Sequence, residues 1–437
     1  MSDELIPDGW TQVKLGDVCV LHRQSVNPGK HPDEVFAHYS LPAFDEGQEP
    51  KLETGSVIKS NKYLVPSDAV LLSKLNPHIP RIWMPDVANN NRPIASTEYL
   101  VLSPKSGCSR GFLYGLFRSS DFFSVFGTMV SGTTGSHQRV TPSHVLEIKI
   151  LLPPLHEQKA IAHILGTLDD KIDQLRKTNT VLEDMASALF KSWFVDFDPV
   201  KAKLENSLTG LPKDLDDLFP DSFEDSALGP IPTGWRVGCV GDVCDLTKSS
   251  VNPGNFPHEV FAHYSLPAYD EGQQPKLELG ASIKSNKYLV PSDAVLLSKL
   301  NPHIPRIWMP DVSTQHRPIA STEFLALCPK PGYSRELVYT LVTSQMFCQI
   351  YGTLVSGTTG SHQRVSPASV LDVAIVLPPE PIANEFFDVT KHNALRVHSN
   401  IQQILTLANL QDTLLPKLIS GDIRVPEAEQ MVAELGL

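Results

Sequence analysis

The sequence IKSNKYLVPSDAVLLSKLNPHIPRIWMPDV occupies residues 58–87 and recurs without change at residues 283–312, an offset of 225 (283 − 58). Shorter identities keep this offset: Gly9-Trp10 recurs as Gly234-Trp235, the segment 130–140 (VSGTTGSHQRV) recurs at 355–365, and Pro153-Pro154 recurs as Pro378-Pro379. A solenoid needs about three or more repeats. The sequence therefore predicts two copies of one globular domain.

Each copy has the pattern of a β-rich domain. Short apolar runs such as 69–72 and 98–102 are bounded by proline and glycine, and the segment 109–126 is more helical. Recent duplication and selection to keep both copies alike each explain the identity. Both explanations imply that the two domains bind the same thing.

A helical segment follows each copy. The first has apolar or small residues at alternating steps of three and four from Ile161 to Trp193, with Asn179 as a polar exception, and Pro199 ends it. The second is less regular and has these apolar positions: Phe386, Val389, Val397, Ile401, Ile404, Leu407, Leu414 and Leu418. A long apolar stripe needs a partner, so we expect the two helices to pack on each other. The alternative is that each helix packs on its own domain.

The expected fold class is α+β, with two tandem β-rich domains separated by two long helices that pack on each other. We expect a first domain at 1–154, a central helix at 155–198, an acidic linker at 199–229, a second domain at 230–379, a C-terminal helix at 380–420 and a tail at 421–437.

The composition predicts a cytoplasmic globular protein. Of 437 residues, 41% are hydrophobic and 20% are charged, which is enough apolar sequence for a sizeable core. The six cysteines are dispersed without a CxxC pair, no apolar run is long enough to span a bilayer, and the first residues do not form a signal peptide. The net charge of −12 argues weakly against nucleic acid, but basic residues gather locally in 58–87.

Catalytic motifs are lacking in the sequence. It has no phosphate loop, no HExxH, no GxGxxG and no [ND]PP[YF]. Asp33, Glu49 and Lys51 resemble the spacing of a metal-dependent nuclease, but the second copy has His258 and Gln274 in place of the two carboxylates. We therefore expect neither a catalytic residue nor a metal site.

Three segments in each domain combine hydrogen-bond donors with apolar anchors. Lysine, arginine, serine and threonine suit phosphate contacts, and asparagine, glutamine and arginine suit base edges, although solvated loops on a β domain have a similar composition. The candidate DNA-binding residues of the first copy are Lys59, Asn61, Lys62, Lys74, Asn76, His78, Arg81, Thr133, Thr134, Ser136, His137, Gln138 and Arg139. Those of the second copy are Lys284, Asn286, Lys287, Lys299, Asn301, His303, Arg306, Thr358, Thr359, Ser361, His362, Gln363 and Arg364.

The assembled phrases resemble a known family. Each domain opens with P-x-G-W (residues 7–10 and 232–235), and the first closes with LPPLHEQ (152–158). The helices end in LFKSWFVDFDPVKAK (189–203) and LLPKLISGDIRV (414–425). Nearly the whole chain is similar to the specificity subunit of a type I restriction–modification system, except at 378–382, where the second PPL-x-EQ phrase is degraded.

The resemblance implies a subunit without catalysis or a cofactor of its own, in which each target-recognition domain reads one half of a bipartite site in double-stranded DNA. It also implies that the two long helices are packed as an antiparallel coiled coil. Two methyltransferase subunits would bring S-adenosylmethionine, and two restriction subunits that use ATP and Mg²⁺ are optional further partners. Because the recognition segments are identical, we expect an interrupted palindrome, contacted by Arg81 and Arg306 or by Arg139 and Arg364. The alternatives are a self-contained site-specific nuclease and a coiled-coil scaffold that does not bind DNA.

Overall fold

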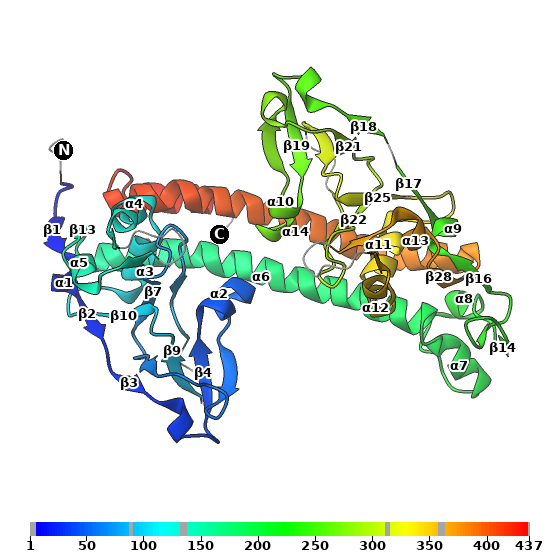
Figure 1. Ribbon diagram of the computed structural model, residues 1–437, viewed down its shortest axis with the longest axis horizontal. Coiled ribbons are helices and arrows are strands. Elements are labelled where there is room, and N and C mark those ends of the chain that lie inside the picture. The colour runs from blue at the N-terminus through cyan, green and yellow to red at the C-terminus, as the bar shows by residue number, and fades with distance from the viewer. Residues whose placement is uncertain are drawn as a thin grey trace. The chain divides into compact units, whose positions relative to one another are not determined.

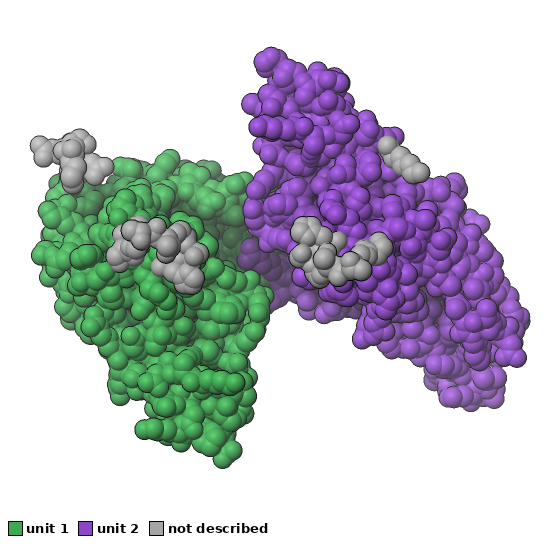
Figure 2. All heavy atoms as spheres, in the orientation of Figure 1, with its two compact units in different colours: residues 1–174, 403–437 green, residues 175–402 purple. Residues whose placement is uncertain are grey.

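The computed structural model describes residues 6–86, 91–131, 138–247, 249–310, 315–356 and 363–435. The chain divides into two compact units (Figure 2): unit 1 comprises residues 1–174 and 403–437, and unit 2 comprises residues 175–402. Each unit contains one copy of the repeated domain and part of each of two long helices.

The first domain is a set of short strands and helices (Figure 1). Its strands are β1 (Thr11–Lys14), β2 (Cys19–His22), β3 (Ser25–Val26), β4 (Val35–Tyr39), β5 (Lys51–Thr54), β6 (Lys62–Leu64), β7 (Val70–Ser73), β8 (Ile82–Trp83), β9 (Arg92–Ala95), β10 (Tyr99–Pro104), β11 (Val130–Ser131), β12 (Arg139–Val140) and β13 (Lys149–Leu152). Its helices are α1 (Leu15–Val18), α2 (Leu41–Gly47), α3 (Arg110–Arg118), α4 (Ser120–Thr128) and α5 (Pro142–Leu146).

Two sheets carry the first domain. One is antiparallel with the order β2-β10-β7-β8, and the other has the order β3-β6-β9-β4-β5, in which only β4 and β9 run parallel. All four residues of β7 are buried, as expected for a strand covered on both faces. Tyr39, Trp83 and Tyr99 belong to one core cluster, in which the indole Nε1 of Trp83 donates to the hydroxyl of Tyr99 at 2.8 Å. The domain core thus joins residues from both sheets.

The second domain repeats this topology. Its strands are β16 (Arg236–Cys239), β17 (Cys244–Leu246), β18 (Ser250–Val251), β19 (Val260–Tyr264), β20 (Lys276–Leu279), β21 (Lys287–Leu289), β22 (Val295–Ser298), β23 (Ile307–Trp308), β24 (Arg317–Ala320), β25 (Phe324–Pro329), β26 (Val355–Ser356), β27 (Arg364–Val365) and β28 (Ala374–Leu377). Its helices are α9 (Val240–Val243), α10 (Leu266–Asp270), α11 (Arg335–Thr343), α12 (Gln345–Thr353) and α13 (Pro367–Leu371).

Two long helices confirm the expected architecture. They are α6 (Leu155–Phe194) and α14 (Glu380–Ser420), so α14 starts 225 residues after α6 despite the degraded phrase before it. In unit 1, Asp169 of α6 accepts from Gln411 of α14 at 2.8 Å, and Glu157 pairs with Arg424 beyond the end of α14 at 3.1 Å. Residue numbers rise along one helix as they fall along the other, so the pairing is antiparallel.

In unit 2, the polar residue predicted on the stripe of α6 faces a second asparagine. The Nδ2 of Asn400 donates to the Oδ1 of Asn179 at 2.7 Å, and the two residues are 1% and 9% exposed. A matched buried amide pair fixes the register of two helices, because any slip would leave both amides without their bond.

One predicted stripe position is wrong. Val389 is 47% exposed, whereas the neighbouring Thr390 is 4% exposed. The Thr390 hydroxyl donates to the backbone oxygen of Phe386 at 2.7 Å, so the helix itself satisfies this polar group and allows its burial. Each helix also packs on its own domain, for example where Gly111 of α3 meets Ala162 of α6.

Residues between the first helix and the second domain are folded. They form α7 (Asp198–Leu204), α8 (Lys213–Asp216), β14 (Phe223–Glu224) and β15 (Ile231–Pro232), and Leu215 and Phe219 enter the core of unit 2. The tail contains α15 (Val425–Ala433). Within the described ranges, none of the helices combines the length and the apolar character that a membrane crossing requires.

Candidate nucleic-acid interface

The structure brings together two of the three predicted segments in each domain. In the first domain, the backbone N–H of Asn76 donates to the backbone oxygen of Gln138 at 2.9 Å, and the N–H of Val140 donates to the backbone oxygen of Lys74 at 3.0 Å. The same bonds join Asn301 to Gln363 and Val365 to Lys299, with the same lengths. We call residues 74–81 with Glu98, Gln138 and Arg139 the first loop cluster, and residues 299–306 with Glu323, Gln363 and Arg364 the second loop cluster.

An asparagine sets the turn in each loop cluster. Asn76 has φ of 50° and Asn301 has φ of 51°, a left-handed conformation that asparagine tolerates better than most residues. Each closes a turn in which Ile79 or Ile304 donates its N–H to the backbone oxygen of the asparagine at 2.9 Å. These asparagines therefore have a structural role that does not depend on a ligand.

Arg139 is held at the surface by a carboxylate. Its Nε and Nη2 donate to the two oxygens of Glu98 at 3.0 and 2.9 Å, and the side chain is 48% exposed. The bonds from Arg139 keep the pKa of the Glu98 carboxyl below its usual range, and the charge of Lys74 adds to this effect. Arg364 and Glu323 form the same pair at 3.1 Å for both bonds.

Arg81 lies deeper than Arg139. Its Nε and Nη2 donate to Asp45, the fifth residue of α2, at 2.7 and 2.9 Å, and the side chain is 12% exposed. Arg306 and Asp270 repeat this pair with the same distances. A guanidinium has five N–H donors, of which these two bonds use two. The pair ties the loop cluster to the helix that follows β4 or β19.

The third predicted segment lies on the other sheet. Lys59 and Asn61 are exposed ahead of β6, but Lys62 is 7% exposed, and its ammonium donates to the hydroxyl of Ser60 at 2.6 Å. Burial lowers the pKa of Lys62. In the second copy Lys284 and Asn286 are exposed, whereas Lys287 is 8% exposed and bonds to Ser285 at 2.6 Å. Within the described residues, the segment's strand β6 pairs with β3 and β9 and not with a strand of the loop cluster.

The remaining predicted residues divide into two groups. His78 and His303 are exposed, and the Nε2 of His303 lies 2.9 Å from the Oε1 of Gln363. The others lie outside the described residues: Thr133, Thr134, Ser136, His137, Thr358, Thr359, Ser361 and His362.

Sequence reasoning missed the carboxylates that hold the arginines. These carboxylates lie outside the unchanged 30-residue stretch: Asp45 and Asp270 precede it, and Glu98 and Glu323 follow it. Both pairs nevertheless keep the 225-residue offset. Among the residues that the structure describes, His, Cys, Asp and Glu do not gather in a group able to hold a metal ion. Each loop cluster therefore offers polar, partly preorganised side chains suited to binding.

Comparisons with known proteins agree with this arrangement. Residues 7–184 match the model of the type I restriction modification DNA specificity domain. The chain is 24% identical to the type I restriction enzyme MjaIX specificity subunit of Methanocaldococcus jannaschii, with 97% of this chain and 95% of that protein covered. It is 23% identical to the HindI specificity subunit of Haemophilus influenzae, with 95% and 99% covered.

A solved structure supports the fold. The type I restriction–modification S subunit from M. genitalium has a TM-score of 0.54 against this chain at 13% identity, with 96% of this chain and 98% of that chain covered. At this identity the similarity concerns the fold alone.

Proposed function

We propose that the whole chain is the sequence-specific DNA-binding specificity subunit of a type I restriction–modification complex, because residues 7–184 match the model of the type I restriction modification DNA specificity domain. The chain itself carries no catalytic step. It selects the site, and its partners perform the chemistry.

The observation that carries the proposal is the duplication of the loop clusters. Their residues are identical, and each arginine pair recurs with distances that agree within 0.2 Å. Identical donors in equivalent backbone frames select the same bases. The two domains therefore read the same half-site.

The order of the chain determines how the half-sites are arranged. Because two equal domains are each followed by one helix of an antiparallel pair, we propose that they read DNA with two-fold symmetry. Two-fold readers require inverted half-sites, about 34–36 Å apart when both lie on one face of B-DNA. The proposed target is therefore an interrupted palindrome with one modified adenine in each half.

The partners follow from the same symmetry. Two methyltransferase subunits bring S-adenosylmethionine and methylate adenine N6, and two ATP- and Mg²⁺-dependent restriction subunits join where restriction occurs. The chain carries a net charge of −12, so it binds DNA weakly alone, and the methyltransferase subunits supply much of the affinity.

Methylation-sensitive sequencing of the host genome tests the target. The expected result is one motif with the same half-site on both strands, and two unrelated half-sites would contradict it. Fluorescence anisotropy on mixed duplexes, with and without methyltransferase, separates a DNA reader from a protein scaffold. Plasmid cleavage by the purified chain with Mg²⁺ would instead indicate a self-contained nuclease.

A further inference from the structure

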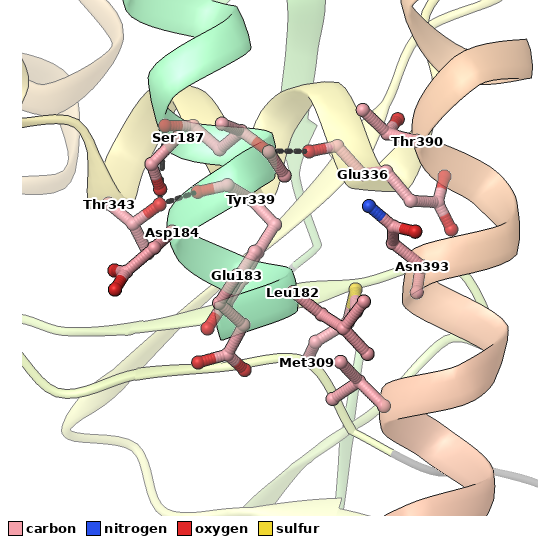
Figure 3. A pocket seen from close by; sticks show the side chains of 14 residues that line it. Leu182, Glu183, Asp184, Ser187, Met309, Glu336, Tyr339, Thr343, Thr390 and Asn393 are labelled. Carbon is pink, nitrogen blue, oxygen red and sulfur yellow. Dashed lines mark hydrogen bonds between the residues drawn. The ribbon is translucent and has the colours of Figure 1, made fainter. Parts of the chain in front are cut away.

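A cavity of about 220 Å³ lies in unit 2 between α6, α11 and α14 (Figure 3). Its lining includes Glu183 from α6, Glu336 and Tyr339 from α11, and Asn393 from α14. Figure 3 shows the side chain of Glu336 pointing from α11 toward Asn393. None of the described residues that line the cavity is a lysine or an arginine, so its electrostatic character is acidic.

The equivalent place in unit 1 holds an arginine. Arg118 of α3 donates to both oxygens of Asp169, at 2.5 and 3.1 Å, and to the Oε1 of Gln411 at 3.2 Å. Its guanidinium carbon lies 5.0 Å from the centre of the Tyr114 ring. The guanidinium is thus bound by a carboxylate, an amide oxygen and an aromatic ring.

The 225-residue offset explains why unit 2 is hollow at this place. Arg118 corresponds to Thr343, Asp169 to Ala394, and Gln411 to Ala186, and all three smaller residues line the cavity. At one further position the residue of unit 2 is larger than its counterpart in unit 1. Gly111, whose added Cβ would lie 2.7 Å from Ala162, corresponds to Glu336, which is too large for so close an approach of the helices.

The substitutions leave the binding chemistry of the site in place. Tyr114 corresponds to Tyr339, so the ring is kept, while Glu183 and Glu336 bring new carboxyl groups in place of Asp169. Partial burial raises the pKa of Glu183, and the neighbouring Asp184 raises it further, although the side chain reaches solvent at the rim. A nearby cation would offset both effects, because it stabilises the charged form of the Glu183 carboxyl.

We propose that this cavity binds a guanidinium group from outside the domain, in the place that Arg118 fills in unit 1. Glu183 and Glu336 pair with its charge, Asn393 offers an amide oxygen, and the Tyr339 ring takes the cation–π contact. The size fits, because a cavity of about 150 Å³ holds benzene and drug-sized ligands need about 300 Å³ or more. A planar guanidinium on a short stem matches this volume.

Saturation-transfer NMR on the full chain with ethylguanidinium tests the proposal at constant ionic strength. We expect saturable transfer to the ethyl protons of ethylguanidinium. Ethylammonium, which lacks the planar fork of donors, should bind at least about tenfold more weakly, and neutral ethylurea should not bind. The group comes either from a free small molecule or from an arginine of a partner protein. Tighter binding of the peptide Gly-Arg-Gly indicates the arginine, and binding of ethylguanidinium alone indicates the small molecule.

Variants place the ligand in the cavity. Thr343→Arg with Ala394→Asp rebuilds the unit 1 pair and should abolish binding, and Tyr339→Leu or Glu336→Gln should weaken it about tenfold. The matched control is Glu271→Gln, which removes an equal charge from an exposed pair with Lys276 and should leave binding unchanged. Arg118→Ala opens the unit 1 site and should raise the stoichiometry from one to two. No saturable binding of either guanidinium probe, or binding unaffected by Thr343→Arg with Ala394→Asp, would overturn the proposal.

Discussion

The two copies of the domain agree at the loop clusters and differ where they join the long helices. The loop clusters keep every residue and both arginine–carboxylate pairs. At the helix junctions, the residue types themselves change from polar in unit 1 to apolar in unit 2. The junctions thus differ within a chain whose loop clusters are unchanged.

The junction of unit 1 is built from polar contacts. The Nε1 of Trp10 donates to Glu157 at 3.0 Å, and Glu157 pairs with Arg424. Gln158, which is fully buried, accepts from the N–H of Ser109 and donates to the backbone oxygens of Gly107 and Pro153. The glutamate and glutamine of the LPPLHEQ phrase therefore attach the domain to its helix.

The junction of unit 2 replaces these contacts with aromatic packing. Glu157 corresponds to Ile382 and Gln158 to Ala383, which are 1% and 3% exposed. Trp235, the counterpart of Trp10, lies 5.9 Å from Phe194 and 5.7 Å from Phe197 between ring centres. Polar contacts in unit 1 and aromatic packing in unit 2 thus both attach a domain to its helix. The PPL-x-EQ phrase can therefore be degraded without loss of the fold.

The largest expected effect tests the aromatic junction. Phe386 is fully buried and its ring centre lies 5.2 Å from Phe194 and 5.9 Å from Phe190, so Phe386→Ala should cost about 3–5 kcal/mol of unfolding free energy. Hydrogen exchange should show the loss in residues 380–402 and much less in residues 155–174. Ile161→Val, at the equivalent place in unit 1, is the control. Equal loss in both segments would mean that the two junctions do not behave as separate structures.

The second prediction tests the identity of the loop clusters. Arg139→Ala and Arg364→Ala should each lower specific affinity by about 1–3 kcal/mol, by equal amounts, and the double variant should show the sum. Anisotropy on the target duplex in the presence of methyltransferase measures this. Unequal losses would show that the two domains read differently.

The more buried arginines provide a separate test. If Arg81→Ala together with Arg306→Ala leaves affinity unchanged, that pair serves the fold through Asp45 and Asp270 and not the DNA. Lys14→Ala, which breaks an exposed pair with Glu147, is the control variant for both arginine tests.

The third prediction concerns the polar junction. Glu157→Gln keeps an acceptor for Trp10 but removes the charge opposite Arg424, which is 42% exposed, so the expected cost is about 1 kcal/mol. As the NaCl concentration is raised, the unfolding free energy of wild-type unit 1 should fall by this amount, and that of the variant should not. Unit 2 gives the comparison, since Ile382 occupies the equivalent place. A salt dependence that survives in the variant would contradict this assignment.

Sequence patterns predicted the repeat and both long helices, because these depend on periodicity and on identity at a fixed offset, whereas the antiparallel direction of the pairing came from the family resemblance. The sequence pattern could not predict which side chains of different helices or strands bond to each other. Asn179 was visible on the stripe, but its bond to Asn400 depends on the register of two helices that are distant in sequence. Likewise Lys62 reads as a basic surface residue, yet its burial beside Ser60 follows from the pleat of β6. Counting the charged residues of a segment therefore overstated the number of basic side chains exposed at the candidate interface.

The smallest expected effect concerns a partly buried histidine–glutamate pair that both copies keep. His38 lies 2.6 Å from Glu53, and His263 lies 2.5 Å from Glu278. Burial lowers the pKa of both histidines below 6.5, although the carboxylates oppose this shift. The folded state then binds fewer protons than the unfolded state, so stability present above pH 6.5 is lost as the pH falls below it.

Comparison of the wild type with His38→Gln plus His263→Gln isolates this contribution. Between pH 7 and 5.5 the wild type should lose unfolding free energy faster than the double variant, and each single variant should remove half of the difference, because the two sites have the same neighbours. Glu98 does not titrate in this window, since its pKa is held below the usual range. A slope carried by one histidine alone would show that the copies have diverged inside the domain as well as at its junction.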